Sequence, residues 1–250
     1  MLFQLEITTH CNYNCFYCAG RKMPQRHMSM ACFDNILSRI AKGERHWVSL
    51  QGEGEPMVHP LFWSMVEKVR DSGYIPYTIT NGSIIDCQRI KQYFPQIGIS
   101  LDTINAEEAQ NIGRFKLNQV LQNLKLLTNQ LSPERIIIHS VDYGQDFKPL
   151  RYFLQQHGLT RHIVQPLQQK SDYRQHYERV FSAVTFEYHY RCRFIEQPTM
   201  RFFTIDGVEL PCCFIKDVSK FTSTQRLQHQ LQQQQVPDAC SGCREITIAS

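Results

Sequence analysis

The sequence has no run of about eighteen consecutive apolar residues, the length that a helix needs to cross a membrane. Its N-terminus, from Met1 to Ile7, has neither a basic start nor a long apolar stretch, so it does not predict a secretory signal. The net charge of +4 is too small to indicate a nucleic-acid partner. We therefore expect a cytoplasmic protein that binds neither a membrane nor a nucleic acid.

The composition is that of an ordinary globular protein. Of the 250 residues, 42% are hydrophobic and 20% are charged, and the length suits one α/β barrel or a domain with an appendage. Ten cysteines are present, several of them clustered in C-x-x-C spacing. Because no secretory signal precedes them, this clustering favours metal binding in a reducing compartment over disulfides.

Three cysteines form the first cluster. Cys11, Cys15 and Cys18 follow a strand-like run in the pattern C-x3-C-x2-C. A four-iron four-sulfur (4Fe-4S) cluster normally takes four cysteine ligands, so a loop with three leaves one iron open for chemistry. The alternative is a zinc knuckle or three unconnected thiols, but zinc sites usually pair C-x2-C units and close with four ligands.

This spacing, with an aromatic residue just before the last cysteine, resembles the signature of the radical S-adenosylmethionine (SAM) enzymes. The resemblance implies that the open iron chelates SAM, and that an electron splits SAM into methionine and a 5'-deoxyadenosyl radical. That radical then takes a hydrogen atom from the substrate. Cys11, Cys15 and Cys18 would be the cluster ligands, Tyr17 would lie against the adenine, and a flavodoxin- or ferredoxin-type protein would donate the electron.

From residue 3 to about residue 166, within an expected barrel domain of residues 1–185, short β-rich runs alternate with helical stretches, which is typical of parallel strands joined by right-handed crossovers. This rhythm predicts an α/β fold, a partial (β/α)6 TIM-like barrel, whose reactive residues gather at the C-terminal ends of the strands. The predicted strands are 3–8, 46–50, 75–80, 97–101, 135–141 and 162–165. The predicted helices are 29–42, 60–72, 86–93, 106–130 and 147–157.

Two motifs follow the second and third predicted strands. The segment with Gly52, Gly54, Glu55 and Pro56 reads G-E-G-E-P and resembles the family's G-G-E-P element, whose backbone and Glu hold the methionine amino group. Glu53 stands where the commonest form has Gly. After the third strand, Thr80-Asn81-Gly82 also resembles a family element that contacts the cofactor, although a strand-ending turn would explain it as well.

Polar residues at the next strand ends are further candidates. Ser100 and Asp102 share one face of the fourth strand because side chains alternate along a strand. The resemblance implies contact with the ribose or the methionine carboxylate, while Asp102 could equally cap the next turn. Ser140 on the fifth strand and Gln165 on the sixth are substrate or cofactor candidates.

A second cysteine set lies in residues 186–250, where the α/β rhythm stops. Asp206-Gly207 predicts the turn of a β-hairpin after residues 201–204, and a polar helix is expected over 224–235. The spacing predicts a second metal site from Cys192, Cys212, Cys240 and Cys243.

The order Cys, Gly-x4-Cys, C-x2-C resembles the auxiliary-cluster domain called twitch, a shortened relative of the SPASM domain. It implies one auxiliary 4Fe-4S cluster, hence two clusters in all, because the further cysteines of the longer domain do not follow Cys243. Cys212 fits Gly-x4-Cys counted from Gly207, which leaves Cys213 as a spare thiol or an alternative ligand. A structural zinc site closed by four cysteines remains the alternative.

The resemblance also implies a reaction class. An auxiliary cluster with four cysteine ligands would accept an electron from the substrate radical, which with loss of a proton gives a two-electron oxidation. The layout is similar to that of 2-deoxy-scyllo-inosamine dehydrogenase, so a small sugar or cyclitol is the expected substrate. One alternative is a maturase that crosslinks or epimerises a ribosomally made peptide, with Cys213 as the hydrogen-atom donor. Another is a non-enzymatic iron-sulfur or zinc protein.

Overall fold

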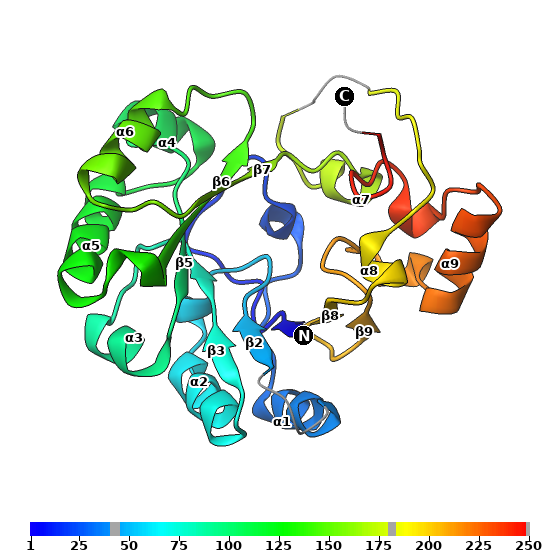
Figure 1. The fold of residues 1–250 in the computed structure, drawn as a ribbon, viewed down its shortest axis with the longest axis horizontal. Helices are drawn as coiled ribbons and strands as arrows, with labels where there is room; N and C mark the ends of the chain where they lie inside the picture. Colours follow the sequence, from blue (N-terminus) through cyan, green and yellow to red (C-terminus); the bar gives the residue numbers. More distant parts are fainter. Residues whose placement is uncertain (41–45, 180–183, 249–250) are drawn as a thin grey trace.

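The computed structural model describes residues 1–40, 46–179 and 184–248, and within them two sheets form one curved wall (Figure 1). The strand order is β3-β2-β1-β8-β9 in the first sheet and β4-β5-β6-β7 in the second. The strands are β1 (Leu2–Leu5), β2 (Trp47–Leu50), β3 (Ile75–Tyr77), β4 (Ile79–Thr80), β5 (Ile97–Ser100), β6 (Ile136–Asp142), β7 (His162–Pro166), β8 (Met200–Phe203) and β9 (Glu209–Leu210).

Helices cover the outer side of this wall, as the crossovers of a parallel sheet require (Figure 1). The neighbouring strands from β1 to β7 pair in parallel within each sheet, which confirms the predicted partial TIM-like barrel. The helices are α1 (Met30–Arg39), α2 (Phe62–Asp71), α3 (Cys87–Tyr93), α4 (Ala106–Ile112), α5 (Leu117–Gln130), α6 (Lys148–Gln156), α7 (Ser171–Arg174), α8 (Arg193–Glu196) and α9 (Thr224–Gln232).

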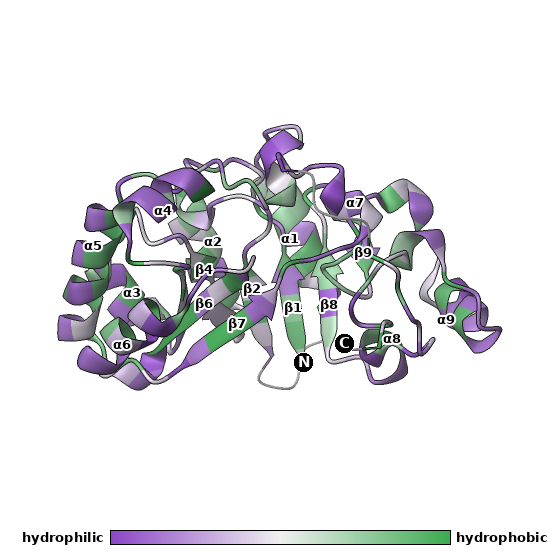
Figure 2. Ribbon diagram, turned by 90° about the horizontal axis from the view of Figure 1, so that it is seen from above, coloured by the Kyte–Doolittle hydropathy of each residue, from purple (hydrophilic) through white to green (hydrophobic). Residues whose placement is uncertain are grey.

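The core lies between the strands and these helices. On β1, Phe3 and Leu5 are buried among helix residues, and the alternation of the strand turns Gln4 toward the concave side. The ribbon coloured by hydropathy shows the same division, with hydrophobic strands inside and hydrophilic outer faces on the helices (Figure 2). In the described residues, no helix is both long and apolar enough to span a membrane.

The predicted strand 75–80 is wrong as a single element. Thr78 separates β3, which pairs with β2, from β4, which pairs with β5. The Thr78 hydroxyl donates to the carbonyl of Leu50 at 2.7 Å, and its own carbonyl accepts from the Gly98 N–H at 2.9 Å. One residue therefore bonds to both sheets at the seam where the wall bends.

The predicted helix 106–130 is also two elements. α4 ends at Ile112 and is followed by Gly113, which has a φ of +98°, and α5 begins after Lys116, which has a φ of +59°. A left-handed residue after a helix ends it, and glycine adopts that conformation without steric cost. The break leaves the last carbonyls of α4 free to bind a neighbouring loop.

Smaller differences concern element ends. β1 ends at Leu5 rather than at residue 8, and α9 ends at Gln232 rather than at residue 235. α1 ends at Arg39, and the predicted last residues of this helix, 41 and 42, lie outside the described residues.

The cysteine-rich C-terminal residues join the barrel through β8. This strand pairs in parallel with β1, so it extends the first sheet, and it pairs antiparallel with β9. The hairpin turn contains Gly207 with a φ of +77°, as the Asp-Gly pair predicted. A second hydrophobic cluster, separate from the barrel core, surrounds Cys192, Cys212, Cys240 and Cys243.

Candidate active site

The three cysteines of the first motif line one cavity of about 270 Å³ at the C-terminal end of β1. Cys11 is exposed, and Cys15 and Cys18 are half-buried. Burial raises the pKa of Cys18 well above its usual range, so the free thiol is neutral at pH 7. A bound metal stabilises the thiolate instead. The other residues on the cavity wall are Asn12, Tyr13, Asn14, Gly20, Arg21, Gln25 and Glu53.

The cysteine loop is held by the break between α4 and α5. The N–H groups of Asn14 and Phe16 donate to the carbonyls of Gly113 and Ile112 at 3.0 and 2.9 Å. A Cβ on Gly113 would collide with the Asn14 backbone. Glycine is therefore required here for the close approach as well as for its left-handed conformation.

The G-E-G-E-P segment lies against the chain that leads into the cysteine loop. The Gly54 N–H donates to the Thr8 carbonyl at 3.2 Å, and the Glu55 N–H donates to the His10 carbonyl at 2.8 Å. A Cβ on Gly54 would lie 2.7 Å from the Thr8 oxygen. Gly52 packs in the same way against the side chain of Glu6. Both glycines allow two backbone segments to touch.

We expect Gly54→Ala to lower the free energy of unfolding by about 3 kcal/mol, the usual upper range for overpacking, because the new methyl group meets backbone atoms that cannot rotate away. Gly73→Ala is the comparison variant, since Gly73 has a positive φ, of +83°, but no atom lies within 4 Å of its Cβ position. That variant should lose only about 1 kcal/mol for backbone strain. Denaturant titration of both variants measures the difference, and equal losses would contradict the packing argument.

Glu55 joins the G-E-G-E-P segment to the end of β4. Its carboxylate is 2% exposed and accepts from the Thr80 hydroxyl and the Asn81 N–H, each at 2.7 Å. It also accepts from the Met57 N–H at 3.1 Å, where Pro56 begins the 3-10 helix Pro56–Val58. These bonds occupy both carboxylate oxygens, so Glu55 acts on the site by fixing its neighbours.

Asn81 carries this network to the cysteines. Its side-chain amide nitrogen donates to the side-chain oxygen (Oδ1) of Asn12 at 2.8 Å and lies 3.9 Å from the Cys11 sulfur. Asn12 in turn donates to the Ser83 hydroxyl at 2.8 Å. Thr80 and Asn81 thus do more than end a strand, because they connect Glu55 to the cysteine loop.

Tyr17, Ser100 and Asp102 are brought together by Arg114. The Tyr17 hydroxyl donates to the Asp102 carboxylate, and the Arg114 guanidinium lies 2.9 Å from the same oxygen. Arg114 also donates to the Ser100 hydroxyl at 2.7 Å and to Tyr17 at 3.1 Å. Burial raises the pKa of Tyr17 well above its usual range, so the phenol remains protonated.

Arg114 is absent from the residues predicted from the sequence, because the sequence analysis predicts one continuous helix over 106–130. Gly113 is a helix-stop signal that would place Arg114 in a loop. The second carboxylate oxygen of Asp102 accepts from the Val141 N–H at 2.8 Å, so both oxygens of Asp102 take part in this buried hydrogen-bond network.

The two remaining candidates, Gln165 and Ser140, lie on neighbouring strands but have different surroundings. Gln165 and Tyr17 share a second, smaller cavity of about 80 Å³ with Val141, Phe214 and Arg244. This cavity lies where the barrel meets the C-terminal residues. Ser140 is buried, and its hydroxyl lies 2.8 Å from His162 Nε2, so it forms a hydrogen bond between β6 and β7.

Glu53 forms an ion pair with Lys216 of the C-terminal residues, and both side chains are nearly buried. Glu53 also accepts from the Gly20 N–H at 3.3 Å and lines the first cysteine cavity. Lys216 lies over the rings of Tyr173 and Phe202 at 5.3 and 5.4 Å. The departure from the family's glycine therefore provides a charged link between the barrel and the C-terminal residues. No local sequence signal marks Lys216.

The second cysteine set also meets at one cavity. Cys192, Cys212, Cys240 and Cys243 are buried and line it together, with apolar neighbours such as Phe194 and Leu227. Cys213 is not on this wall, and its carbonyl lies 3.4 Å from the Tyr173 hydroxyl. In the described chain, no three His, Cys, Asp or Glu side chains are arranged to hold a single metal ion.

Comparison with known proteins assigns the family. Residues 5–155, more than half of the chain, match the radical SAM superfamily. The chain belongs to this superfamily. It is therefore a radical SAM enzyme, whose family uses a 4Fe-4S cluster and SAM, and the non-enzymatic alternative is set aside.

Among curated radical SAM relatives, a probable GTP 3',8-cyclase of Methanococcus maripaludis is 28% identical over 118 residues, which is 44% of this chain and 39% of the relative. The chain spans half or less of the length of the first curated relatives it matches.

Two solved structures share the fold. SuiB of Streptococcus suis, bound to the precursor peptide SuiA, has a TM-score of 0.70 at 12% identity, covering 92% of this chain and 63% of SuiB. BtrN, in complex with AdoMet and 2-DOIA, has a TM-score of 0.59 at 12% identity, covering 97% of this chain and 92% of BtrN. The match to BtrN covers nearly the whole chain, so the likeness in fold extends beyond residue 155.

The first cavity of this radical SAM enzyme suits the family's cofactors. Three thiols share one wall with an exposed Cys11, and the cavity has room beyond the sulfurs. Three cysteine ligands leave one iron of a cluster open, which is the coordination the family requires for SAM. The donor set and the accessible cavity are therefore consistent with the cluster and with SAM.

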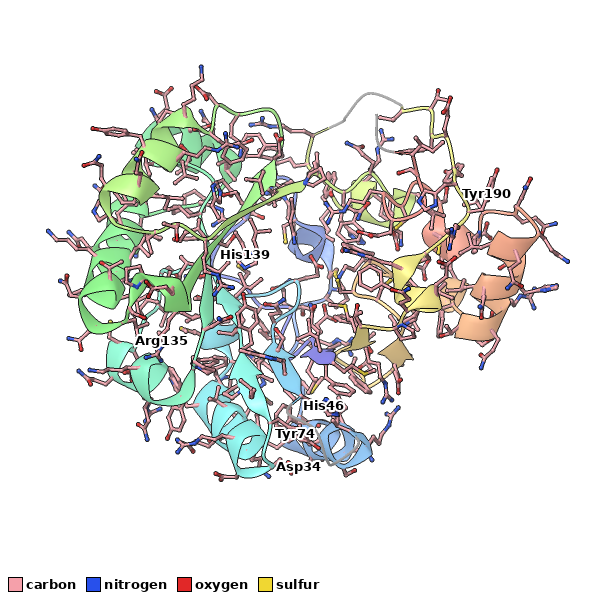
Figure 3. The ribbon with its side chains drawn as sticks, in the orientation of Figure 1. Asp34, His46, Tyr74, Arg135, His139 and Tyr190 are labelled. Atoms are coloured by element: carbon pink, nitrogen blue, oxygen red, sulfur yellow. The ribbon has the colours of Figure 1, made fainter. Side chains whose placement is uncertain are left out.

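The concave side of the radical SAM barrel is polar. Ser49 lies between Gln4 and Tyr77 in the strand register, and the Tyr77 hydroxyl lies 3.0 Å from His139 Nε2. Figure 3 shows His139 near the centre of the barrel. Burial lowers the pKa of His139 to about 4, so the ring is neutral at pH 7. A neutral, hydrogen-bonding interior surface results.

Proposed function

We propose that this radical SAM enzyme is an oxidoreductase that oxidises a small hydroxylated molecule, such as a sugar or cyclitol, by two electrons: it removes one hydrogen atom first, and then one electron and one proton. The observation that supports this proposal is the cavity lined by the four buried cysteines Cys192, Cys212, Cys240 and Cys243, which we call the auxiliary cavity. Four thiolates satisfy a 4Fe-4S cluster completely. Such a cluster has no open iron to bind a substrate, so its role would be to accept and donate electrons.

The proposal divides the chain into a radical SAM barrel, residues 1–185, and an auxiliary-cluster unit, residues 186–250. Cys11, Cys15 and Cys18 would hold the first cluster, and Cys192, Cys212, Cys240 and Cys243 the second. When bound, the first cluster and SAM supply a primary carbon radical that abstracts a substrate hydrogen atom. A flavodoxin- or ferredoxin-type protein would deliver the starting electron.

The chain's own residues would shape the site. The backbone of Gly52 and Gly54 and the Asn81 side chain would orient SAM at the cysteine cavity, because Glu55 holds this segment in place. Tyr17 is held by Asp102 and Arg114 and would lie against the adenine, beside the cavity that Tyr17 and Gln165 line. Ser100 would stand near the ribose through its bond to Arg114.

A polar substrate fits the barrel interior. Glu6, Ser49, Gln51 and His139 each have a buried polar atom with no hydrogen-bond partner among the described residues. Buried polar groups normally have a partner, so these residues have bonding capacity that hydroxyl or amino groups would satisfy after small side-chain rotations. The solved complex of BtrN contains 2-DOIA, which makes an aminocyclitol the first compound to try.

The test is anaerobic reconstitution with iron and sulfide, followed by dithionite reduction and SAM. We expect about eight irons per chain, from two four-iron clusters, and 5'-deoxyadenosine as a product. With 2-deoxy-scyllo-inosamine or myo-inositol deuterated at each ring carbon, we expect deuterium in 5'-deoxyadenosine and one ketone per SAM consumed. Bound zinc, or deuterium transfer without a ketone, would contradict the oxidation.

The structural likeness to SuiB favours one second candidate, maturation of a ribosomally made peptide. Cys213 is not on the wall of the auxiliary cavity and lies near Tyr173 and Lys216, where a thiol could return a hydrogen atom to a substrate radical. For an epimerase, Cys213→Ala should abolish inversion while hydrogen abstraction continues. Unchanged turnover of this variant with a cyclitol would favour oxidation.

A further inference from the structure

A lysine is buried in the wall of the auxiliary cavity. Lys170 is 1% exposed and lines the cavity with the four cysteines. Its ammonium group donates to the carbonyls of Phe214 and Ala239, each at 2.6 Å, and pairs with Asp172 at 3.2 Å. Lysine is almost never fully buried unless it is paired, and these three partners satisfy its three donors.

The charge of Lys170 acts on the cysteine sulfurs. Burial raises the pKa of Cys240 to about 12 and that of Cys243 to about 11, and in both cases Lys170 opposes the rise. It acts in the same direction on Cys212. The lysine therefore favours negative charge on three of the four thiols.

The other charges around this cavity are mutually paired. Asp172 faces Lys170 and also accepts from the Lys216 N–H at 2.9 Å. Glu245 lies on the same wall, and its carboxylate is 3.0 Å from Arg193 and 3.5 Å from Arg244. Lys170 is the cation among the residues that line this cavity, and Asp172 is the charge that partly offsets it.

We propose that Lys170 raises the reduction potential of the cluster held by these cysteines, so that it accepts the electron from the substrate radical. This inference rests on the proposed oxidation. One added electron increases the negative charge at the sulfurs, and a fixed cation stabilises the reduced state more than the oxidised state. Lys170 touches no substrate, so it is a positioning residue in this reaction.

The substrate carbon radical loses one electron to the auxiliary site, its hydroxyl O–H bond breaks, and a C=O bond forms. The proton passes to water. A ferredoxin- or flavodoxin-type protein then takes the electron away, which restores the oxidised site. Lys170 favours the first of these transfers.

The experiment measures the potential directly. The full chain with Cys15→Ala keeps only the auxiliary site, and its reduction is followed by electron paramagnetic resonance during a potentiometric titration. We expect Lys170→Met to lower the potential by at least 59 mV, a tenfold change in the one-electron equilibrium. Lys170→Arg should keep the original value. Asp172→Asn should move the potential the opposite way, because it removes the negative charge.

Lys68→Met is the matched control, since it removes the same charge from an exposed ion pair on α2 and should leave the potential unchanged. If Lys170→Met does not retain iron, Asp172→Asn still gives the sign of the effect. An unchanged potential in Lys170→Met, or a downward shift in Asp172→Asn, would overturn the role of Lys170 alone. Failure of the parent chain to bind a second cluster would overturn this role and the proposed function together.

Discussion

Replacing Cys15 by alanine is expected to reduce the formation of 5'-deoxyadenosine to background. Cys15 shares the wall of the first cavity with Cys11 and Cys18, and two thiolates cannot replace three in holding a 4Fe-4S cluster. Without that cluster, SAM has neither its binding iron nor its electron source. Chromatography after dithionite reduction measures the product, and the iron content should fall from about eight to about four per chain.

The control for this experiment is Cys87→Ala. Cys87 begins α3 and packs beside the barrel core, away from both cysteine cavities. This variant should keep the full iron content and the full rate of SAM cleavage. Cleavage of SAM by the Cys15 variant at the parental rate would refute the ligand assignment.

Replacing Cys212 by alanine should have a different effect, with loss of about four irons per chain while 5'-deoxyadenosine is still formed. Cys212 lines the auxiliary cavity, so its loss opens that cluster and leaves the first site intact. Substrate hydrogen should still enter 5'-deoxyadenosine. Formation of the ketone should stop because the substrate radical has lost its electron acceptor.

Cys213→Ala is the matched control, because the two cysteines are adjacent and have the same chemistry. Only Cys212 is on the cavity wall, so Cys213→Ala should retain about eight irons per chain. Iron analysis and Mössbauer spectroscopy of the two variants distinguish the residues. The opposite result, with iron lost only from Cys213→Ala, would reverse the assignment.

The two variants together separate the chemistry of the two cavities. The first should be required for making any radical, and the second for ending the reaction as an oxidation. This division follows from the number of cysteines on each wall, three in one and four in the other. A maturase that epimerises a peptide would instead be sensitive to Cys213.

Much of the fold could be predicted from local patterns. The alternation of β-rich and helical segments indicated the partial barrel, and the spacing of Cys11, Cys15 and Cys18 indicated the radical SAM superfamily, which the match over residues 5–155 confirms. Both signals come from short segments. The periodicity of apolar residues predicts which face of a helix or strand is buried. A short loop can surround a cluster only if its cysteines are a few residues apart.

Other features were missed because they depend on partners far along the chain. Thr78 divides a strand since its neighbours belong to two different sheets. Arg114 joins Tyr17 to Asp102 only after the break at Gly113 turns it toward the cysteine loop. In both cases the interacting residues are too far apart in the sequence for a local pattern to predict the contact.

The sequence by itself determined the two sets of cysteines, their order and the barrel that carries the first, because spacing and periodicity are properties of short segments. Only the tertiary structure decided which thiols face each cavity, that Lys216 meets Glu53, and that Lys170 lies buried beside the second set. Lys170 lies 44 positions from Phe214 and 69 positions from Ala239 along the chain, and Lys216 lies still farther from Glu53. The pairing of β8 with β1 and the packing around it bring these residues together.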